Sequence, residues 1–222
     1  MAVFAVVCTA MMALTQWLTA PAIEASRYQE RMQVLQALLP TGSYDNDVVQ
    51  DAISLGPTPA LGLRYGGRVY RARLGTQPAA LIVEAHAPDG YAGEIQLLVG
   101  VRADGRLTGV RVTAHKETPG LGDYIDIRKD RRSPPWMSQF TNLSFAQLEM
   151  SKWKPRREGG GFDDVTGATL SARAVIRASA AALAFILHNE ELLYTTPTGE
   201  RLDGLLAPDA GDLESRIQRY HP

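Results

Sequence analysis

The hydroxyl of Thr169 lies where phosphate chemistry is possible, at the junction of a glycine-rich loop and a predicted helix. The first backbone N–H groups of a helix and the positive end of its dipole favour a bound anion. Gly167 lets the backbone approach a ligand closely or adopt a positive φ, and Ala168 keeps the space beside the hydroxyl open. The pattern therefore favours a phosphate-holding site at Thr169.

The same residues also fit an ordinary helix start. Thr166 would then cap the helix, and Asp163 and Asp164 would lie beside the positive end of its dipole. On shape alone, this second explanation carries more weight. A pattern with five specified positions, however, should arise by chance in only about one chain of this length per thousand.

The segment from Asp163 to Thr169 resembles the D-x-x-[ST]-G-A-[ST] motif of covalent FMN-binding domains, in which the FMN phosphate is joined to the last Ser or Thr. The resemblance makes Asp163 the motif acid, Thr166 the first hydroxyl residue and Thr169 the site of a covalent FMN. Thr169 would be a tether and not a catalytic nucleophile. A separate flavin transferase, using FAD and magnesium, would make the bond.

A second segment, HKETPGLGD from His115 to Asp123, resembles the HxETPGLG loop of the G subunit of the Rnf electron-transport complex. Its ETPGLG core also resembles the C subunit of the sodium-translocating NADH:quinone reductase. The sequences DYI at residues 123–125 and WMSQF at residues 136–140 extend the likeness to the Rnf protein. The resemblance covers nearly the whole chain, with its elements in the same order.

This loop supplies the other candidate flavin-binding residues, which are Glu117, Thr118, Gly120, Leu121 and Gly122. Its proline and glycines predict a tight turn with accessible backbone N–H groups, suited to hydrogen bonds with a flavin edge. Polar contact from Glu117 and Thr118 would adjust the redox potential of the ring. The alternative is a Pro-Gly turn that binds no ligand.

Four further residues near the motif have two explanations each. Trp136 and Trp153 would either stack on a flavin or belong to the core, which is the commoner place for an aromatic residue. Arg156 and Arg157 would either meet a phosphate or lie in a solvated loop.

Composition excludes several other classes of function. Lys and Arg number 23 against 24 Asp and Glu, so there is no basic surface typical of nucleic-acid binding. The single cysteine, Cys8, excludes an internal disulfide and any all-cysteine iron–sulfur site within the chain. The four histidines, including His221, lack the spacing of a metal site. We expect no metal ligands and no catalytic residues.

The first 23 residues carry no charged side chain and are long enough, as a helix, to cross a hydrocarbon core of about 30 Å. Trp17 suits an interfacial anchor, and no basic segment precedes the apolar stretch as it would in a signal peptide. A cleaved signal is the alternative, because Ala20-Pro21-Ala22 resembles a cleavage site. We favour an uncleaved membrane span.

Beyond the span, the pattern predicts an amphipathic helix to Pro40, because Tyr28, Met32, Leu35 and Leu39 recur at helical spacing. A short helix over residues 48–55 would follow. Strands are then expected from residues 61 and 79, with a hairpin that pairs residues 94–102 with 106–115 around a turn at 103–105. The last elements are a short helix at 136–140, a long helix at 170–188, and a tail with a strand or loop and a short polar helix.

These elements predict an α+β fold, a twisted antiparallel sheet with packed helices, plus one N-terminal transmembrane helix. We divide the chain into an anchor at 1–23, an amphipathic stalk and linker at 24–60, a covalent FMN-binding domain at 61–190, and a C-terminal extension at 191–222.

The Rnf resemblance implies a single-pass protein of the bacterial inner membrane with its FMN domain on the periplasmic side. It would relay single electrons within a complex that couples electron flow between ferredoxin and NAD to ion transport. Its partners would be the other Rnf membrane subunits, including iron–sulfur and second FMN-bearing subunits. Three alternatives stay open: the C subunit of the quinone reductase, a membrane-anchored flavin-bearing regulatory module, and a periplasmic adaptor without a cofactor.

Overall fold

The computed structural model describes residues 2–39 and 42–219. Pro40, where we expected the first helix to stop, and His221 lie outside the described residues. The α-helices are α1 (Ala2–Gln36), α2 (Thr169–Thr195) and α3 (Ala210–Arg219). The strands are β1 (Ala52–Leu55), β2 (Gly67–Leu74), β3 (Gln77–Gly90), β4 (Gly93–Arg102), β5 (Leu107–Ala114) and β6 (Arg201–Leu202).

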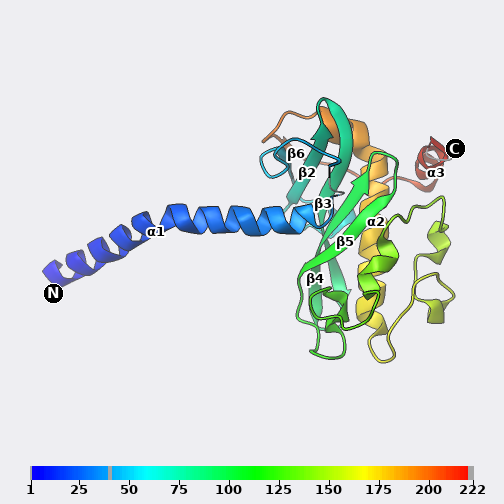
Figure 1. The fold of residues 1–222 in the computed structure, drawn as a ribbon, viewed down its shortest axis with the longest axis horizontal. Helices are drawn as coiled ribbons and strands as arrows, with labels where there is room; N and C mark the ends of the chain where they lie inside the picture. Colours follow the sequence, from blue (N-terminus) through cyan, green and yellow to red (C-terminus); the bar gives the residue numbers. More distant parts are fainter. Residues whose placement is uncertain (1, 40–41, 220–222) are drawn as a thin grey trace.

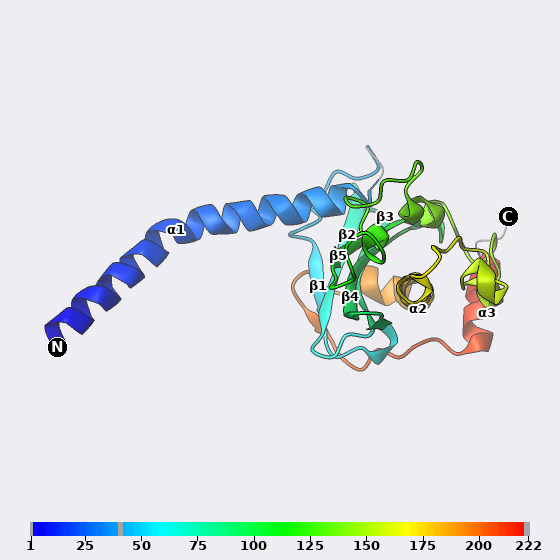
Figure 2. The same cartoon turned by 90° about the horizontal axis from the view of Figure 1, so that it is seen from below.

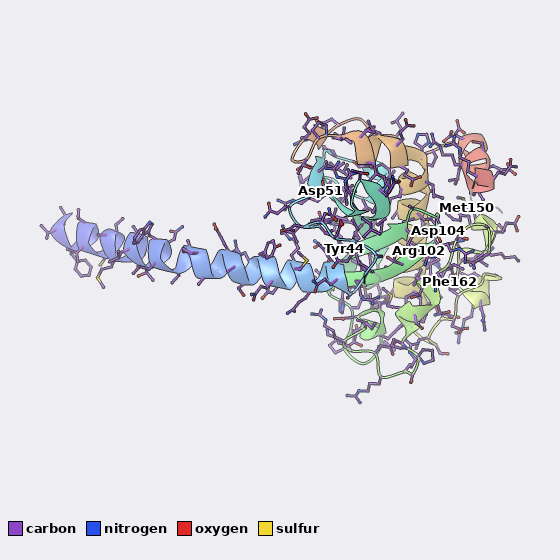
Figure 3. All side chains as sticks on the ribbon, turned by 45° about the horizontal axis from the view of Figure 1, so that its top comes forward. Tyr44, Asp51, Arg102, Asp104, Met150 and Phe162 are labelled. Atoms are coloured by element: carbon purple, nitrogen blue, oxygen red, sulfur yellow. The ribbon has the colours of Figure 1, made fainter. Side chains whose placement is uncertain are left out.

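Helix α1 extends away from the rest of the molecule, and its side chains project on all sides over most of its length (Figures 1 and 3). Its most apolar 18-residue window has a mean hydropathy of 1.7 and no buried residue, as a membrane span requires. Helix α2 is also long and apolar, but 67% of its window is buried, which identifies it as the core helix.

The last turns of α1 lie against the folded domain, as the amphipathic pattern predicted. Leu35 is fully buried, and the Tyr28 hydroxyl donates a hydrogen bond to Asp47 Oδ2 at 2.6 Å. The helix ends at Gln36, before the expected proline, and Leu39 is buried in the turn that follows.

A six-stranded sheet with the order β5-β4-β3-β2-β1-β6 forms the centre of the domain. Neighbouring strands pair antiparallel from β1 to β5, while the short β6 joins β1 in parallel, so the sheet is mixed only at this edge. The predicted hairpin is confirmed, with Leu97 opposite Val112 and Val99 opposite Val110. The predicted α+β class is confirmed.

Each face of the sheet has its own core. Helix α2 crosses one face (Figure 2). Val83, Val99, Val175 and Phe185 belong to the larger cluster of buried residues there. On the other face, the end of α1 and the turn after it cover part of the sheet, with Leu35 in a smaller cluster. Both faces of the sheet are therefore at least partly covered.

Two sequence expectations are corrected. Residues 48–55 do not form a helix, because a turn leads into β1, whose burial alternates so that Ile53 and Leu55 face the core. Helix α2 runs from Thr169 to Thr195 and is longer than the expected 170–188. The tail contains the strand β6 and the polar helix α3, as expected.

The segment between β5 and α2 is irregular and carries the 3₁₀ helices η2 (Asp123–Ile125), η3 (Trp136–Phe140), η4 (Met150–Lys152) and η5 (Arg156–Glu158). Another 3₁₀ helix, η1, covers Pro59–Leu61. The expected short helix at residues 136–140 is thus present as η3. This segment brings the residues before α2 close to the loop after β5.

Candidate functional site

The motif from Asp163 to Thr169 leads directly into α2. Gly167 has a φ of +88°, a left-handed conformation that favours glycine, and the backbone N–H of Ala168 donates to Val165 O at 3.0 Å. Ala168 occupies the cap position and no side chain caps the helix. The predicted capping role of Thr166 is therefore wrong, since its hydroxyl instead accepts a hydrogen bond from Arg157.

The loop after β5 folds as a tight turn opposite the start of α2. Gly120 has a φ of +75°, and the N–H groups of Leu121 and Gly122 both donate to Thr118 O, at 3.1 and 3.0 Å. The N–H of Gly120 donates to Asp123 Oδ1 at 2.8 Å. These N–H groups have partners within the loop, so our expectation of accessible donors is wrong for this conformation.

A cavity of about 300 Å³ separates the loop from the helix start. Seven predicted site residues line it: Glu117, Thr118, Leu121, Gly122, Gly167, Ala168 and Thr169. Three lining residues were not predicted: Tyr91, Leu170 and Ser171. Asp163, Thr166 and Gly120 are not among the lining residues. Two segments about 50 residues apart in the sequence therefore form one site.

Thr169 is the partly exposed hydroxyl at the first residue of α2. Its Oγ1 donates to Asp164 Oδ2 at 3.1 Å, and Arg157 Nε lies 3.1 Å from the same carboxylate oxygen. Asp163 instead pairs with Arg156, at 2.8 Å, in an exposed position. Thr169 thus contacts Asp164 and not the motif acid Asp163. The motif leaves the position of Asp164 unspecified.

Glu117 connects the loop after β5 to the first turn of α2 and to the turn between β3 and β4. It is 4% exposed, its Oε2 accepts from Ser171 Oγ at 2.6 Å, and its Oε1 accepts from the N–H of Ala92 at 3.1 Å. A Cβ on Gly122 would lie 2.9 Å from Glu117 Oε2, and one on Gly90 would lie 2.9 Å from Oε1. Both glycines therefore leave room for the carboxylate.

Tyr124 contacts the backbone at the end of the motif. Its hydroxyl donates to Ala168 O at 3.1 Å, and burial raises the pKa of Tyr124 to about 12, so the hydroxyl stays protonated. The Tyr124 ring packs edge-on against Trp136, with 5.5 Å between centroids. Trp136 and Trp153 are 3% and 5% exposed, which confirms that they belong to the core.

The site has the features that a phosphate needs. The helix start has no side-chain cap and faces a cavity, so its first N–H groups and the positive end of its dipole are available to an anion. Asp164 opposes an anion, and its pairing with Arg157 offsets that charge. Over residues 2–39 and 42–219, no three His, Cys, Asp or Glu side chains are grouped as a metal site would need.

Comparison with known proteins gives the family. The model of the FMN-binding domain matches residues 90–184, which include both walls of the cavity, and the model of the RnfG N-terminal region matches residues 1–38. The G subunit of the ion-translocating oxidoreductase complex from Pseudomonas aeruginosa is 44% identical over 190 residues, which cover 86% of this chain and 87% of that protein.

The proteins of the same name from Vibrio cholerae and Pseudoalteromonas atlantica are similar over the same extent. The first is 40% identical over 197 residues, covering 89% of this chain and 92% of that protein. The second is 38% identical over 195 residues, covering 88% and 89%. With its apolar first helix and its FMN-binding domain, the chain belongs to the family of G subunits of the ion-translocating oxidoreductase complex.

Proposed function

We propose that this chain is the electron-carrying member of a membrane-bound, Rnf-type ferredoxin:NAD oxidoreductase complex that translocates ions, and that its FMN is joined to Thr169 by a phosphoester. One observation carries the proposal: Thr169 lines the cavity at the uncapped start of α2. An anion attached there would meet the first N–H groups of the helix. The names of the relatives and the matched FMN-binding domain support the assignment.

The contacts of the other hydroxyls favour Thr169 as the attachment residue. Ser171 also lines the cavity, but it is 1% exposed and its Oγ donates to Glu117 at 2.6 Å. Thr118 is exposed on the opposite wall, where no helix dipole would stabilise a phosphate. Thr169 combines access with the helix start, and its hydrogen bond to Asp164 is longer, at 3.1 Å.

A bound flavin supplies the redox chemistry, because it exchanges electrons one at a time, and the chain supplies position and electrostatics. Three partly exposed side chains, Tyr91, Leu121 and Leu170, border the cavity and suit contact with a flat aromatic ring. The carboxylate of Glu117 lies at the cavity wall, where a negative charge disfavours added electrons on a nearby ring.

Arg157 is the side chain best placed to reach a phosphate on Thr169. It contacts Asp164 and Thr166, and about half of its side chain is exposed, so it can turn toward the phosphate at small cost. Esterification removes the proton that Thr169 donates to Asp164. The positive charge of Arg157 would then lie between two anions.

We place the FMN-binding domain on the periplasmic side of the inner membrane. The partners would be the other Rnf proteins, including iron–sulfur and second FMN-bearing subunits, and a flavin transferase would mature the chain. The match of residues 1–38 to the RnfG N-terminal region favours this role over the C subunit of the quinone reductase. Alkaline phosphatase fused to the C-terminus should be active if the domain is periplasmic; an inactive phosphatase with a fluorescent cytoplasmic reporter fusion would contradict that location.

The experiment that tests the attachment site is coexpression of the full chain with a flavin transferase. The protein should fluoresce on a denaturing gel under ultraviolet light and gain the mass of one FMN phosphoester. Thr169→Ala should lose both signals and keep its melting temperature. Thr195→Ala, at the exposed far end of the same helix, is the matched control and should load normally. A flavin on the Thr169→Ala protein would refute the assignment.

A further inference from the structure

A second cavity, of about 500 Å³, lies on the opposite face of the sheet from α2. One wall is the end of α1, with Arg27, Glu30 and Arg31, and the floor is the sheet, with Tyr70 and Glu84. This cavity shares no lining residue with the FMN site. It therefore needs an explanation of its own.

The cavity contains charges of both signs that the fold leaves unpaired. Within the described residues, neither Arg27 nor Arg31 forms an ion pair, although both lie one helical turn apart on the same wall. Glu84 also lacks an ion pair in this part of the chain, and its Oε1 accepts a hydrogen bond from the Tyr70 hydroxyl at 3.0 Å. The helical wall thus presents Arg27 and Arg31 with Glu30 between them, and the carboxylate of Glu84 lies on the sheet.

The position of the cavity relative to the membrane span decides what can occupy it. Arg27 and Arg31 follow Ile23, the last residue of the apolar stretch, by four and eight positions, which is about 6 and 12 Å along a helix. The headgroup layer on each side of a bilayer is about 5–7 Å thick. Arg27 therefore lies at the outer boundary of the headgroup layer, and Arg31 lies about 5 Å beyond it.

The outer face of the sheet is turned toward the side from which α1 arrives, while α2 lies on the far side (Figures 1 and 2). The floor of the cavity accordingly faces the membrane surface. The Arg27 side of the cavity is level with the lipid headgroups, and a headgroup that rises a few ångström from its leaflet can reach Arg31.

We propose that this cavity binds the headgroup of a phospholipid that carries both a phosphate and a primary ammonium, as phosphoethanolamine does. The guanidinium groups of Arg27 and Arg31 would hold the phosphate, because arginine matches phosphate geometry with paired N–H donors. Glu84 would accept hydrogen bonds from the ammonium group. The opposing charges fit a zwitterion better than a purely anionic headgroup. The bound lipid would fix the domain at the membrane surface independently of its flavin.

The test is native mass spectrometry of the full chain in detergent, mixed with equal amounts of phosphatidylethanolamine, phosphatidylcholine and phosphatidylglycerol that have identical acyl chains. We expect phosphatidylethanolamine adducts to exceed phosphatidylcholine adducts at least fivefold, because a trimethylammonium group cannot donate hydrogen bonds. They should also exceed phosphatidylglycerol adducts, which offer no cation to Glu84. Equal binding of all three lipids, or a preference for phosphatidylglycerol, would overturn the proposal.

Substitutions test separately the residues proposed to bind the phosphate and the residue proposed to bind the ammonium group. The double variant Arg27→Gln/Arg31→Gln should lose phosphatidylethanolamine adducts at least fivefold, and Glu84→Gln should reduce them to the phosphatidylcholine level. Arg64→Gln and Glu214→Gln, exposed residues outside the cavity, should bind like wild type. Thermal unfolding verifies that each variant is folded. Unchanged adducts in the double variant or in Glu84→Gln would refute the site, whatever the flavin content.

Discussion

The two ends of helix α2 are built in opposite ways. At the N-terminal end, no side chain caps Thr169, and the first turn borders a cavity. At the C-terminal end, Arg71 is 1% exposed and donates to Leu193 O at 3.2 Å and to Thr196 O, while Arg73 donates to Tyr194 O at 2.7 Å. At the C-terminal end, the arginines thus bind backbone carbonyl groups that have no hydrogen-bond partner within the helix. At the N-terminal end, the first backbone N–H groups are left available to a ligand.

Asp51 supports the C-terminal end by contacting both arginines. It lies just before β1, where Figure 3 labels it, and its carboxylate accepts hydrogen bonds from Arg71, from Arg73 at 2.9 Å and from Thr198 at 2.9 Å. Burial alone would raise the pKa of Asp51, but these hydrogen bonds lower it below its ordinary value. The comparison indicates that stability is concentrated at one end of the helix, which leaves the other free to bind a ligand.

The largest expected effect is the loss of the buried arginine. Arg71→Met should lower the free energy of unfolding by about 3–5 kcal/mol, because Asp51 and the helix carbonyls lose a shared buried partner. Urea denaturation of the flavin-free chain, followed by fluorescence of the buried Trp136 and Trp153, measures the change.

Arg64→Met is the matched control, because Arg64 is exposed, and it should change the stability by less than about 0.5 kcal/mol. An Arg71→Met protein as stable as this control would mean that the C-terminal end of α2 does not depend on its side-chain contacts.

A smaller effect is expected at the N-terminal end. Ser171→Ala should cost about 2 kcal/mol, because the buried carboxylate of Glu117 loses the hydroxyl 2.6 Å away. Ser179→Ala is the control in the same helix: this buried hydroxyl donates to Val175 O at 2.8 Å, a carbonyl available to the helix itself. It should cost less than about 1 kcal/mol. Equal losses in the two variants would remove the special role of the Glu117 contact.

Local sequence patterns predicted most of the strands and helices of the fold. Alternating apolar residues gave the β4–β5 hairpin, and helical spacing gave α2 within one residue at its start. The strand β1 was mistaken for a helix, because four residues are too few to separate the two periods without knowledge of their neighbours. Its pairing with β2 decides the conformation.

The contacts that organise the site were less predictable. Seven of the ten predicted site residues line one cavity, because both motifs are short and distinctive. Ser171 was missed, since its partner Glu117 lies 54 positions away in the sequence. Arg71 was missed for the same reason, as it contacts a carbonyl 122 positions away. A buried ionic residue in a strand looks like an exposed one when only its neighbours in sequence are known.

The hydrogen bond from Tyr124 to Ala168 O should contribute about 1 kcal/mol to the free energy of unfolding, and this contribution should depend on pH. Tyr124→Phe should cost about 1 kcal/mol at pH 8, because the hydrogen bond to Ala168 O is lost. The pKa of Tyr124 is about 12 in the folded chain and about 10 in an unfolded one, so wild type loses stability as the pH rises from 10 to 12.

At pH 11 this loss amounts to about 1.4 kcal/mol, and phenylalanine avoids it. The difference between wild type and Tyr124→Phe should therefore fall to zero or change sign between pH 8 and pH 11. The other tyrosines are present in both proteins, so they cancel. A difference that stays constant over this range would show that Tyr124 ionises as easily in the folded chain as in the unfolded one.

The smallest expected effect distinguishes a motif residue from a helix cap. Loss of a capping Thr costs about 1 kcal/mol, but Thr166 is not at the cap position of α2 and its hydroxyl accepts a hydrogen bond from the exposed Arg157. Thr166→Ala should therefore change the free energy of unfolding by less than about 0.5 kcal/mol. If flavin loading falls while stability is unchanged, the transferase contacts this residue; a loss of 1 kcal/mol would restore the capping role and make both ends of α2 alike.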